Sequence, residues 1–261
     1  MAGEHPRDAV PLIARAEEVQ TYFRSLFAQR PDDARPPFVI FAQGRSGSRL
    51  LVDLLNSHPD IICEREILYH RRLLPVRYAI GREAATRPDT VYGFKVKIYQ
   101  LEYVQNYESA ADFLDALTDR NWKLVHLWRQ DIFRQCISAR MAWQKNLWHA
   151  NDQKQDQVDQ TVHMDAEKLA SEMRSRIQYR EQEKAILDGR EHLEINYEED
   201  LSTPQAQQRT LNDIFEYLGL DAHPVSTNMK KTSKRHLSDQ ISNYDEVIET
   251  VAKQGLAQYL P

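Results

Sequence analysis

A glycine- and serine-rich turn at residues 43–49 connects an apolar run to an apolar helical pattern in the stretch FVIFAQGRSGSRLLVDLL. Backbone N–H groups at the start of such a helix point toward the turn without helical partners, and the helix dipole adds partial positive charge there. Gly44 and Gly47 let the turn curl and let an anion approach the backbone closely. We therefore predict a phosphate or sulfate site formed by Gly44, Arg45, Ser46, Gly47, Ser48 and Arg49.

The same turn argues against a nucleoside triphosphate. A Walker-type loop has the pattern G-x-x-x-x-G-K-[ST], whereas here Gly44 and Gly47 are three apart and Arg49 follows Ser48. The long loop and its lysine are both missing. A P-loop-type nucleotide-dependent kinase is therefore the weaker alternative, and a turn that only caps its helix is another.

A second cationic group follows the apolar run KLVHLW at 123–128. Arg129 stands at the carboxyl end of this strand, which is where open α/β sheets bind ligands. If the next helix begins near residue 130, Ser138 lies about two turns into it. We expect the side chains of Arg129 and Ser138 to converge on a second anion.

The elements that must position these groups follow an alternating pattern. Short apolar runs are bounded by turn or polar residues, and at least three precede helical patterns, which indicates βαβ units around a mostly parallel sheet. We expect one doubly wound α/β domain, with an amphipathic helix at 15–30 ahead of it and a solvated, charged helix at about 165–188. The apolar runs are FVIFA (38–42), VYGFKVKI (91–98), KLVHLW (123–128) and HLEINY (192–197).

Composition excludes several classes of function. The formal net charge of −5 over 261 residues argues against general nucleic-acid binding, which needs a broad basic surface. No apolar window reaches the roughly 18 residues of a membrane span, and the first ten residues lack the apolar core of a secretory signal, so we expect a cytoplasmic protein. Cys63 and Cys136 form no CxxC pair, and no spacing of histidines or carboxylates indicates a metal site.

Together these motifs resemble those of the sulfotransferases that use 3′-phosphoadenosine 5′-phosphosulfate (PAPS). GRSGSRLL is similar to their 5′-phosphosulfate loop, and segment 129–138 is similar to their 3′-phosphate-binding strand and helix. Within that superfamily the sequence is most similar to bacterial carbohydrate sulfotransferases of the Nod-factor and trehalose type, from about residue 38 to 250. Further matching motifs are NSHPDIICEREIL, GFKVKIYQL, INYEEDL and KKTSKRHLSDQISNYDEV.

The resemblance implies a P-loop-like three-layer α/β domain, with a mostly parallel central sheet flanked by helices, at 36–261. Residues 1–35 are then an N-terminal helical extension. It also implies in-line transfer of the sulfuryl group from PAPS to an acceptor hydroxyl, with PAP as product and no metal. The acceptor is expected to be a small molecule or saccharide, in particular a carbohydrate or glycolipid. A homodimer is left open, and a non-catalytic PAPS- or PAP-binding module is the second alternative.

Removal of the acceptor proton needs a carboxylate in the cleft. Glu66 aligns best with the Gly-Glu-x-[Leu/Phe] pattern of the related enzymes, and Glu64 is the second candidate. Arg45 and the loop N–H groups are expected to stabilise the charge that develops during transfer, joined by Lys95 from the neighbouring strand. Lys97 falls on the same side of that strand as Lys95 because side chains alternate.

For the 3′-phosphate, the resemblance assigns Arg129 as the main cation and Ser138 as a hydroxyl donor. Lys234 or Arg235 is expected to add a contact from the late loop KKTSKRH. A solvated basic turn is the alternative for that loop.

Aromatic side chains are candidates for the acceptor site. Tyr69, Trp143 and Trp148 could stack on a sugar face, while anchoring of the polar loop to the core is the other interpretation of the two tryptophans. Arg49 stands where the related enzymes often have threonine, which brings a further cation to the loop.

Overall fold

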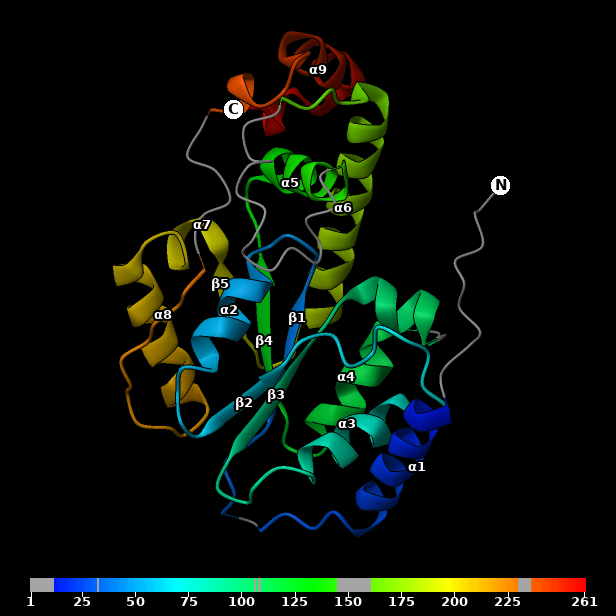
Figure 1. Cartoon of the computed structure of the whole chain (residues 1–261), viewed down its shortest axis with the longest axis vertical. Coiled ribbons are helices and arrows are strands. Elements are labelled where there is room, and N and C mark those ends of the chain that lie inside the picture. The colour runs from blue at the N-terminus through cyan, green and yellow to red at the C-terminus, as the bar shows by residue number, and fades with distance from the viewer. Residues whose placement is uncertain (1–11, 32, 106, 108, 145–160, 230–235) are drawn as a thin grey trace.

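A computed structural model of the protein describes residues 12–31, 33–105, 107, 109–144, 161–229 and 236–261. In this part of the chain five strands form a single sheet (Figure 1). They are β1 (Phe38–Ala42), β2 (Ile61–Glu64), β3 (Val91–Val96), β4 (Lys123–Trp128) and β5 (Leu193–Asn196). Their order is β2-β3-β1-β4-β5, and every neighbouring pair is parallel.

Helices separate most of the strands along the chain and cover both faces of the sheet. Successive parallel strands need such crossovers, because the end of one strand and the start of the next lie at opposite ends of the sheet. The helical segments are α1 (Leu12–Phe27), α2 (Ser48–Leu55), α3 (Pro75–Glu83), η1 (Gln100–Val104), α4 (Ala110–Thr118), α5 (Ile132–Gln144), α6 (Ala166–Leu187), α7 (Tyr197–Asp200), α8 (Pro204–Tyr217), η3 (Leu237–Asp239), α9 (Tyr244–Val251), η4 (Ala252–Leu256) and η5 (Ala257–Tyr259).

Two apolar cores lie on the two faces of the sheet. On one face, α2 and α8 pack their buried leucine, isoleucine and phenylalanine side chains against β1, β4 and β5. On the other face, α3, α4 and the end of α6 pack against β1, β3 and β4. Every residue of β1 is completely buried, as expected for the central strand of a parallel sheet. The expected α/β fold, three layers around a parallel sheet, is confirmed.

A third core joins α5, the first half of α6, and α9 beyond the sheet (Figure 1). The charged helix expected at about 165–188 is α6, but one side of it is buried and not solvated as predicted. Leu169, Ala170 and Met173 are completely buried in this third core, and the carboxylate residue Glu183 is completely buried nearer the sheet. The helix therefore connects the outer helices to the sheet.

The strand β2 was not expected from the sequence, because only four residues form it and Ile62 remains 39% exposed. The other four strands fall within the runs that the sequence indicated, although β3 and β5 are shorter than those runs. The amphipathic helix expected at 15–30 is α1, displaced by three residues. Among the described helices, none is both long enough and apolar enough to cross a membrane.

Candidate active site

The turn between β1 and α2 has the sharp geometry that its glycines allow. Gly47 has φ 92° and Arg45 has φ 64°, both in the left-handed region. A Cβ atom at Gly47 would lie 2.2 Å from a ring carbon of Tyr197, so a larger residue would be both strained and obstructed there. We call residues 43–48 the anion loop; its last residue, Ser48, is the first residue of α2.

Side chains from α5 and α6 fix the first half of the anion loop. The carbonyl oxygen of Gly44 accepts hydrogen bonds from Gln135 Nε2 (2.9 Å) and Arg176 Nη1 (2.8 Å). Gln43 Nε2 donates to the Arg176 carbonyl (3.2 Å) and to Glu183 Oε2 (3.1 Å). The sequence analysis did not single out Gln135, Arg176 or Glu183. The apolar residues Leu169, Ala170 and Met173, which recur at helical spacing, were the available sign that α6 packs against the rest of the protein.

Four arginines gather at the anion loop. Burial lowers the pKa of Arg45, and the nearby positive charges of Arg129, Arg176 and Arg49 lower it further. Arg129 and Arg176 also have carboxylate partners, Glu198 and Glu172, and Arg49 is exposed. The positive charge around Arg45 is nevertheless large enough to lower its pKa, and an anion bound at the loop would relieve that repulsion.

The two expected anion sites meet at Arg45. Its Nε and Nη2 donate to Ser138 Oγ (3.0 and 2.8 Å), and its carbonyl oxygen accepts from Arg129 Nη1 (3.3 Å). Arg129 follows β4 directly, as expected. Ser138 contacts the side chain of Arg45, whereas Arg129 contacts its backbone. Arg129 and Ser138 are therefore linked through Arg45, which lies between them.

Two residues of α7 hold Arg129. Its Nε donates to Glu198 Oε1 (3.1 Å), and its guanidinium carbon lies 4.8 Å from the centroid of the Tyr197 ring. The other oxygen of Glu198 accepts from the backbone N–H of Gln130 (2.9 Å). Tyr197 thus covers Gly47 and supports Arg129, linking the anion loop to the end of β4.

A carboxylate with two lysine partners lies beside the loop. Glu66 Oε1 is 2.6 Å from Lys95 Nζ, and Glu66 Oε2 is 2.7 Å from Lys97 Nζ. Gln100 Nε2 also donates to Glu66 Oε2 (2.8 Å). Lys95 Nζ in turn donates to Ser48 Oγ at the start of α2 (3.2 Å). One ammonium group therefore contacts both the anion loop and the Glu66 carboxylate.

Opposing effects set the proton affinities of this cluster. Burial alone would raise the pKa of Glu66, but Lys95 and Lys97 outweigh burial and the pKa is lowered. The pKa of Lys95 is lowered, because burial and the charge of Lys97 outweigh Glu66. Burial also acts to lower the pKa of Lys97, but Tyr99 and Glu66 raise it above its ordinary value. Glu66 is thus an ionised carboxylate at neutral pH.

Glu64 faces a different environment. Its carboxylate forms an ion pair with Arg82 of α3, in which Arg82 Nε is 3.0 Å from Oε2. The hydroxyl of Tyr92 donates to the same oxygen (2.5 Å). These partners occupy Glu64 on the face of the sheet opposite to α2, where Tyr92 belongs to the second core.

The remaining expected site residues differ in their exposure. Arg49 is exposed in the first turn of α2, and Tyr69 and Trp143 are 62% and 69% exposed. Ser46 is buried and its hydroxyl donates to the Gln43 carbonyl (2.8 Å), so it stabilises the turn. Trp148, Lys234 and Arg235 lie outside the described residues.

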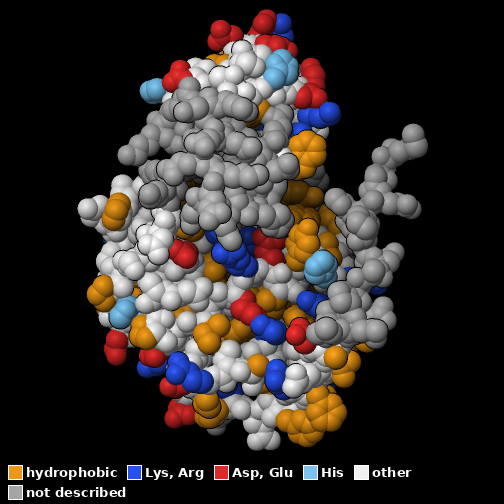
Figure 2. Space-filling view, in the orientation of Figure 1, with side chains coloured by type: hydrophobic (Ala, Val, Ile, Leu, Met, Phe, Trp, Pro, Cys, Tyr) orange, Lys and Arg blue, Asp and Glu red, His pale blue; other side chains and the backbone are white. Residues whose placement is uncertain are grey.

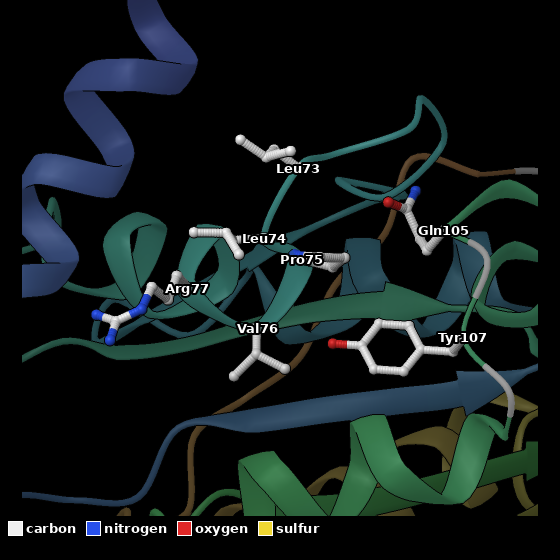
Figure 3. A pocket seen from close by; sticks show the side chains of 7 residues that line it. All are labelled: Leu73, Leu74, Pro75, Val76, Arg77, Gln105 and Tyr107. Atoms are coloured by element: carbon white, nitrogen blue, oxygen red, sulfur yellow. The ribbon is translucent and has the colours of Figure 1, made fainter.

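Two cavities occur away from Glu66 in the described structure. One, of about 270 Å³, lies between the start of α3 and the segment after η1 (Figure 3). The other, of about 500 Å³, lies near the ends of β4 and β5. Among the described residues, no group of three or more histidines, cysteines or carboxylates could hold a metal ion. The first cavity is lined by Leu73, Leu74, Pro75, Val76, Arg77, Gln105 and Tyr107, and the second by Trp128, Gln130, Arg180, Lys184, Glu194, Asn196, Glu199 and Asp200.

The parallel sheet and the anion loop after its central strand define a P-loop-like α/β protein. The profile of the Stf0 sulphotransferase family matches residues 79–247, and the chain belongs to this family. It is therefore a sulfotransferase, and the family implies PAPS as the sulfuryl donor.

A solved structure, the crystal structure of a sulfotransferase from Alicyclobacillus acidocaldarius, has the same fold with a TM-score of 0.52. The match covers 86% of this chain and 95% of that one, at 19% sequence identity. No curated protein sequence matches this one significantly.

Proposed function

We propose that the protein transfers the sulfuryl group of PAPS to a hydroxyl of a carbohydrate or glycolipid, with Glu66 as the general base. The observation that carries this proposal is the chain of contacts from Ser48 through Lys95 to Glu66. It joins an anion loop to an ionised carboxylate, and a group transfer from a bound anion to a hydroxyl needs both.

The donor is proposed to bind with its two anionic ends at two neighbouring points of the site. The 5′-phosphosulfate would meet the anion loop, the N–H groups at the start of α2, Arg45 and Lys95. The 3′-phosphate would meet Arg129 and Ser138, supplemented by Lys234 or Arg235. Support comes from the positive charges of Arg129, Arg176 and Arg49, which lower the pKa of Arg45 and which a multiply charged nucleotide would help to balance.

The proposed reaction is a single in-line displacement. The acceptor oxygen forms a bond to sulfur while the bond from sulfur to the phosphate oxygen breaks, and PAP departs with the bonding electrons. The acceptor proton passes to Glu66. Lys95 and the loop donors stabilise negative charge as it grows on the departing phosphate and the sulfuryl oxygens.

Donor binding is expected to affect the base as well. Lys95 contacts both Ser48 and Glu66, so a phosphosulfate in the loop would compete with Glu66 for the same ammonium group. Weakening this ion pair raises the proton affinity of Glu66. The carboxylate would then become a stronger base when the donor is present.

The kinase alternative has less support, because the loop carries Arg49 after Ser48 where a triphosphate loop has lysine before its hydroxyl. A non-catalytic module needs no carboxylate at the loop. Its chemistry does not explain why Glu66 is ionised and held against the ammonium that contacts Ser48.

Isothermal titration with PAP, with ADP, and with ATP and magnesium tests the donor site. We expect PAP to bind without metal, and Arg129→Ala to weaken it by about thirtyfold, or about 2 kcal/mol. The matched control is Arg35→Ala, since Arg35 is exposed and pairs with Asp60, and it precedes β1 instead of following a strand at the loop. Its PAP affinity should stay within about twofold of the wild type.

Transfer is tested separately with ³⁵S-labelled PAPS and a panel of saccharides and glycolipids. Magnesium-dependent ATP binding with no preference for PAP would contradict the proposal and favour the kinase. Tight PAP binding, with no label transferred to any saccharide, glycolipid, phenol or amine, would favour the non-catalytic module.

A further inference from the structure

A fully buried carboxylate lies beside the anion loop, on a helix whose other charged residues are mostly exposed. Glu183 of α6 has no exposed surface. Figure 2 shows lysine, arginine and carboxylate side chains gathered in the middle of the displayed face, but Glu183 is not among them because solvent does not reach it. A buried carboxylate costs folding free energy unless it is well paired, so this residue calls for an explanation.

The contacts of Glu183 do not pair it fully. Its Oε2 accepts a hydrogen bond from Gln43 Nε2 (3.1 Å) and lies 3.7 Å from His126 Nε2, which is beyond hydrogen-bond length. Within the described chain, Glu183 Oε1, Gln43 Oε1 and His126 Nε2 are buried without hydrogen-bond partners. An apolar side chain of similar size often fills such a position at a lower cost in folding free energy. The carboxylate is therefore better explained by its contact with Gln43 than by stability.

Gln43 connects Glu183 to the anion loop, of which it is the first residue. The Gln43 amide donates to Glu183 Oε2 and to the carbonyl oxygen of Arg176 (3.2 Å). The Gln43 carbonyl accepts from the hydroxyl of Ser46 (2.8 Å). The side chain of Gln43 is thus tied to α6 and its backbone to the middle of the loop. A displacement of Gln43 would therefore be passed on to the loop.

Two side chains of α6, seven residues apart, hold consecutive residues of the loop. Arg176 Nη1 donates to the Gly44 carbonyl (2.8 Å), while Glu183 accepts from Gln43. Seven residues are about two helical turns, so both side chains lie on the same side of α6. The first half of this helix is packed in the third core with α5 and α9 (Figure 1). The backbone just ahead of Arg45 is therefore fixed to a helix that is itself firmly packed.

The sign of its charge separates Glu183 from the residues that attract a donor. A carboxylate close to an anion site opposes the binding of an anion, and a low local dielectric strengthens this repulsion. Its useful property is that a carboxylate oxygen holds an amide donor more strongly than a neutral oxygen does. Glu183 can thus favour donor binding through the shape of the loop, although its charge acts in the opposite direction.

We propose that Glu183 is a positioning residue for donor binding, whose carboxylate holds the Gln43 amide from α6 and so keeps the anion loop in the shape that receives the 5′-phosphosulfate. This inference rests on the proposed function, because it concerns the same donor site. It assigns a role to a residue that touches neither the donor nor the acceptor.

Amide hydrogen exchange of the donor-free protein tests the anchor without any ligand. In Glu183→Leu we expect the amides of residues 44–48 to exchange about tenfold faster, because local opening of the loop then costs less free energy. Glu183→Gln keeps an oxygen that can accept from Gln43, so exchange should stay near the wild-type rate. Urea unfolding should show Glu183→Leu to be at least as stable as the wild type, which separates loosening of the loop from misfolding.

Titration with PAP measures the consequence for the donor. Glu183→Leu should weaken PAP binding by about tenfold, whereas Glu183→Gln should stay within about threefold of the wild type. Gln43→Ala should weaken PAP binding at least as much as Glu183→Leu. The double variant should bind no more weakly than Gln43→Ala alone, because Glu183 acts through that residue.

The matched control is Glu249→Leu on α9. Glu249 is exposed and forms an ion pair with Lys253 on the same helix. Its replacement removes a glutamate without touching the anion loop. Loop exchange and PAP affinity should both remain at their wild-type values.

Tighter or unchanged PAP binding in Glu183→Leu, with unchanged loop exchange, would overturn this inference while the donor site stands. An equal loss in Glu183→Gln and Glu183→Leu would also overturn it, because an accepting oxygen alone would then not hold the loop. Failure of the wild-type protein to bind PAP would remove the proposed function and the role of Glu183 in donor binding, even if loop exchange changes as expected.

Discussion

Glu64 and Glu66 are separated by one residue, yet their carboxylates work in different surroundings. Glu64 ends β2, and its carboxylate contacts Arg82 of α3 and Tyr92 of β3. Glu66 lies beyond the strand and turns toward Lys95 and the start of α2. The first environment belongs to the packing of the second core, and the second borders the anion loop.

The two carboxylates differ in whether a bound donor could take away one of their partners. The bonds of Glu64 come from a guanidinium and a phenol that have no other role in the site, and hydrogen bonding to Glu64 is the main cause that raises the pKa of Arg82. The partners of Glu66 include an ammonium that a donor anion would attract. A structural ion pair keeps its partners throughout, whereas a general base must lose part of its ion pairing when it accepts a proton.

The largest expected difference between the two carboxylates is in turnover. Glu66→Gln should lower kcat by about 10²-fold to 10⁴-fold, the usual contribution of a general base. PAP affinity should not fall and should rise modestly, because the neutral amide no longer competes with the 5′-phosphate for Lys95. Steady-state kinetics with ³⁵S-labelled PAPS, beside a PAP titration, measure both. A Glu66→Gln variant with normal kcat would exclude Glu66 as the base.

Glu64→Gln should instead affect stability. It leaves Arg82 and Tyr92 without their anionic partner, and we expect a loss of about 1–3 kcal/mol in the free energy of unfolding, since the pair is only partly buried. Urea unfolding measures this loss, and kcat per folded molecule should stay near the wild type. A large drop in kcat with unchanged stability would exchange the roles of the two glutamates.

A smaller effect is expected on the pH profile. Lys97 helps to lower the pKa of Glu66 in the donor-free protein, so kcat/KM for PAPS, which reports the free enzyme, should fall in acid only below the ordinary glutamate value of about 4.3. Lys97→Met removes one of the two lowering charges, and the acid limb of kcat/KM should move to higher pH. Lys123→Met, which acts at the opposite end of the sheet, is the control. A limb that stays in place would show that Glu66 does not produce it.

The lowered pKa of Glu66 also makes the free energy of unfolding depend on pH. Because the folded pKa of Glu66 is below its unfolded value, its ion pairs contribute stability that is fully present above the ordinary carboxyl range. That stability is lost as the pH falls through the lowered folded pKa. In Lys97→Met the acid-dependent part of the unfolding free energy should therefore shrink.

The smallest expected change is that of Tyr92→Phe. It removes one hydrogen bond to Glu64 but keeps the ring that packs in the second core, so we expect a loss of about 1 kcal/mol in the free energy of unfolding. Thermal unfolding measures it. Any effect on kcat would indicate that the Glu64 environment communicates with the site.

Much of the fold could be predicted because its evidence is local. The run FVIFA followed by a glycine-rich turn and an amphipathic helix indicates one strand–turn–helix unit regardless of the rest of the chain. Alternation along β3 placed Lys95 and Lys97 on one side, and both do contact Glu66. The strand β2 was missed because four residues with one exposed isoleucine give too short a pattern.

The side chains that complete the site could not be predicted in the same way. Arg176 and Glu183 belong to a highly charged helix, and only packing shows that they face the anion loop. Glu198 was visible in INYEEDL, but its contact with Arg129 depends on how β4 and β5 pair. Sequence spacing indicates which residues share an element, whereas long-range contacts decide which elements meet.

The strand order also has a consequence for the synthesis of the protein. Phe38 in β1 pairs with Gly93 in β3 and Lys123 in β4, so both neighbours of the central strand leave the ribosome well after it. Until then the apolar strand FVIFA has no sheet partner and is a potential site of aggregation. The surroundings of the anion loop are completed later still, because Tyr197, which covers Gly47, follows β5 in the chain. A nascent chain that ends before Tyr197 would therefore carry every residue of the loop but not the ring that covers Gly47.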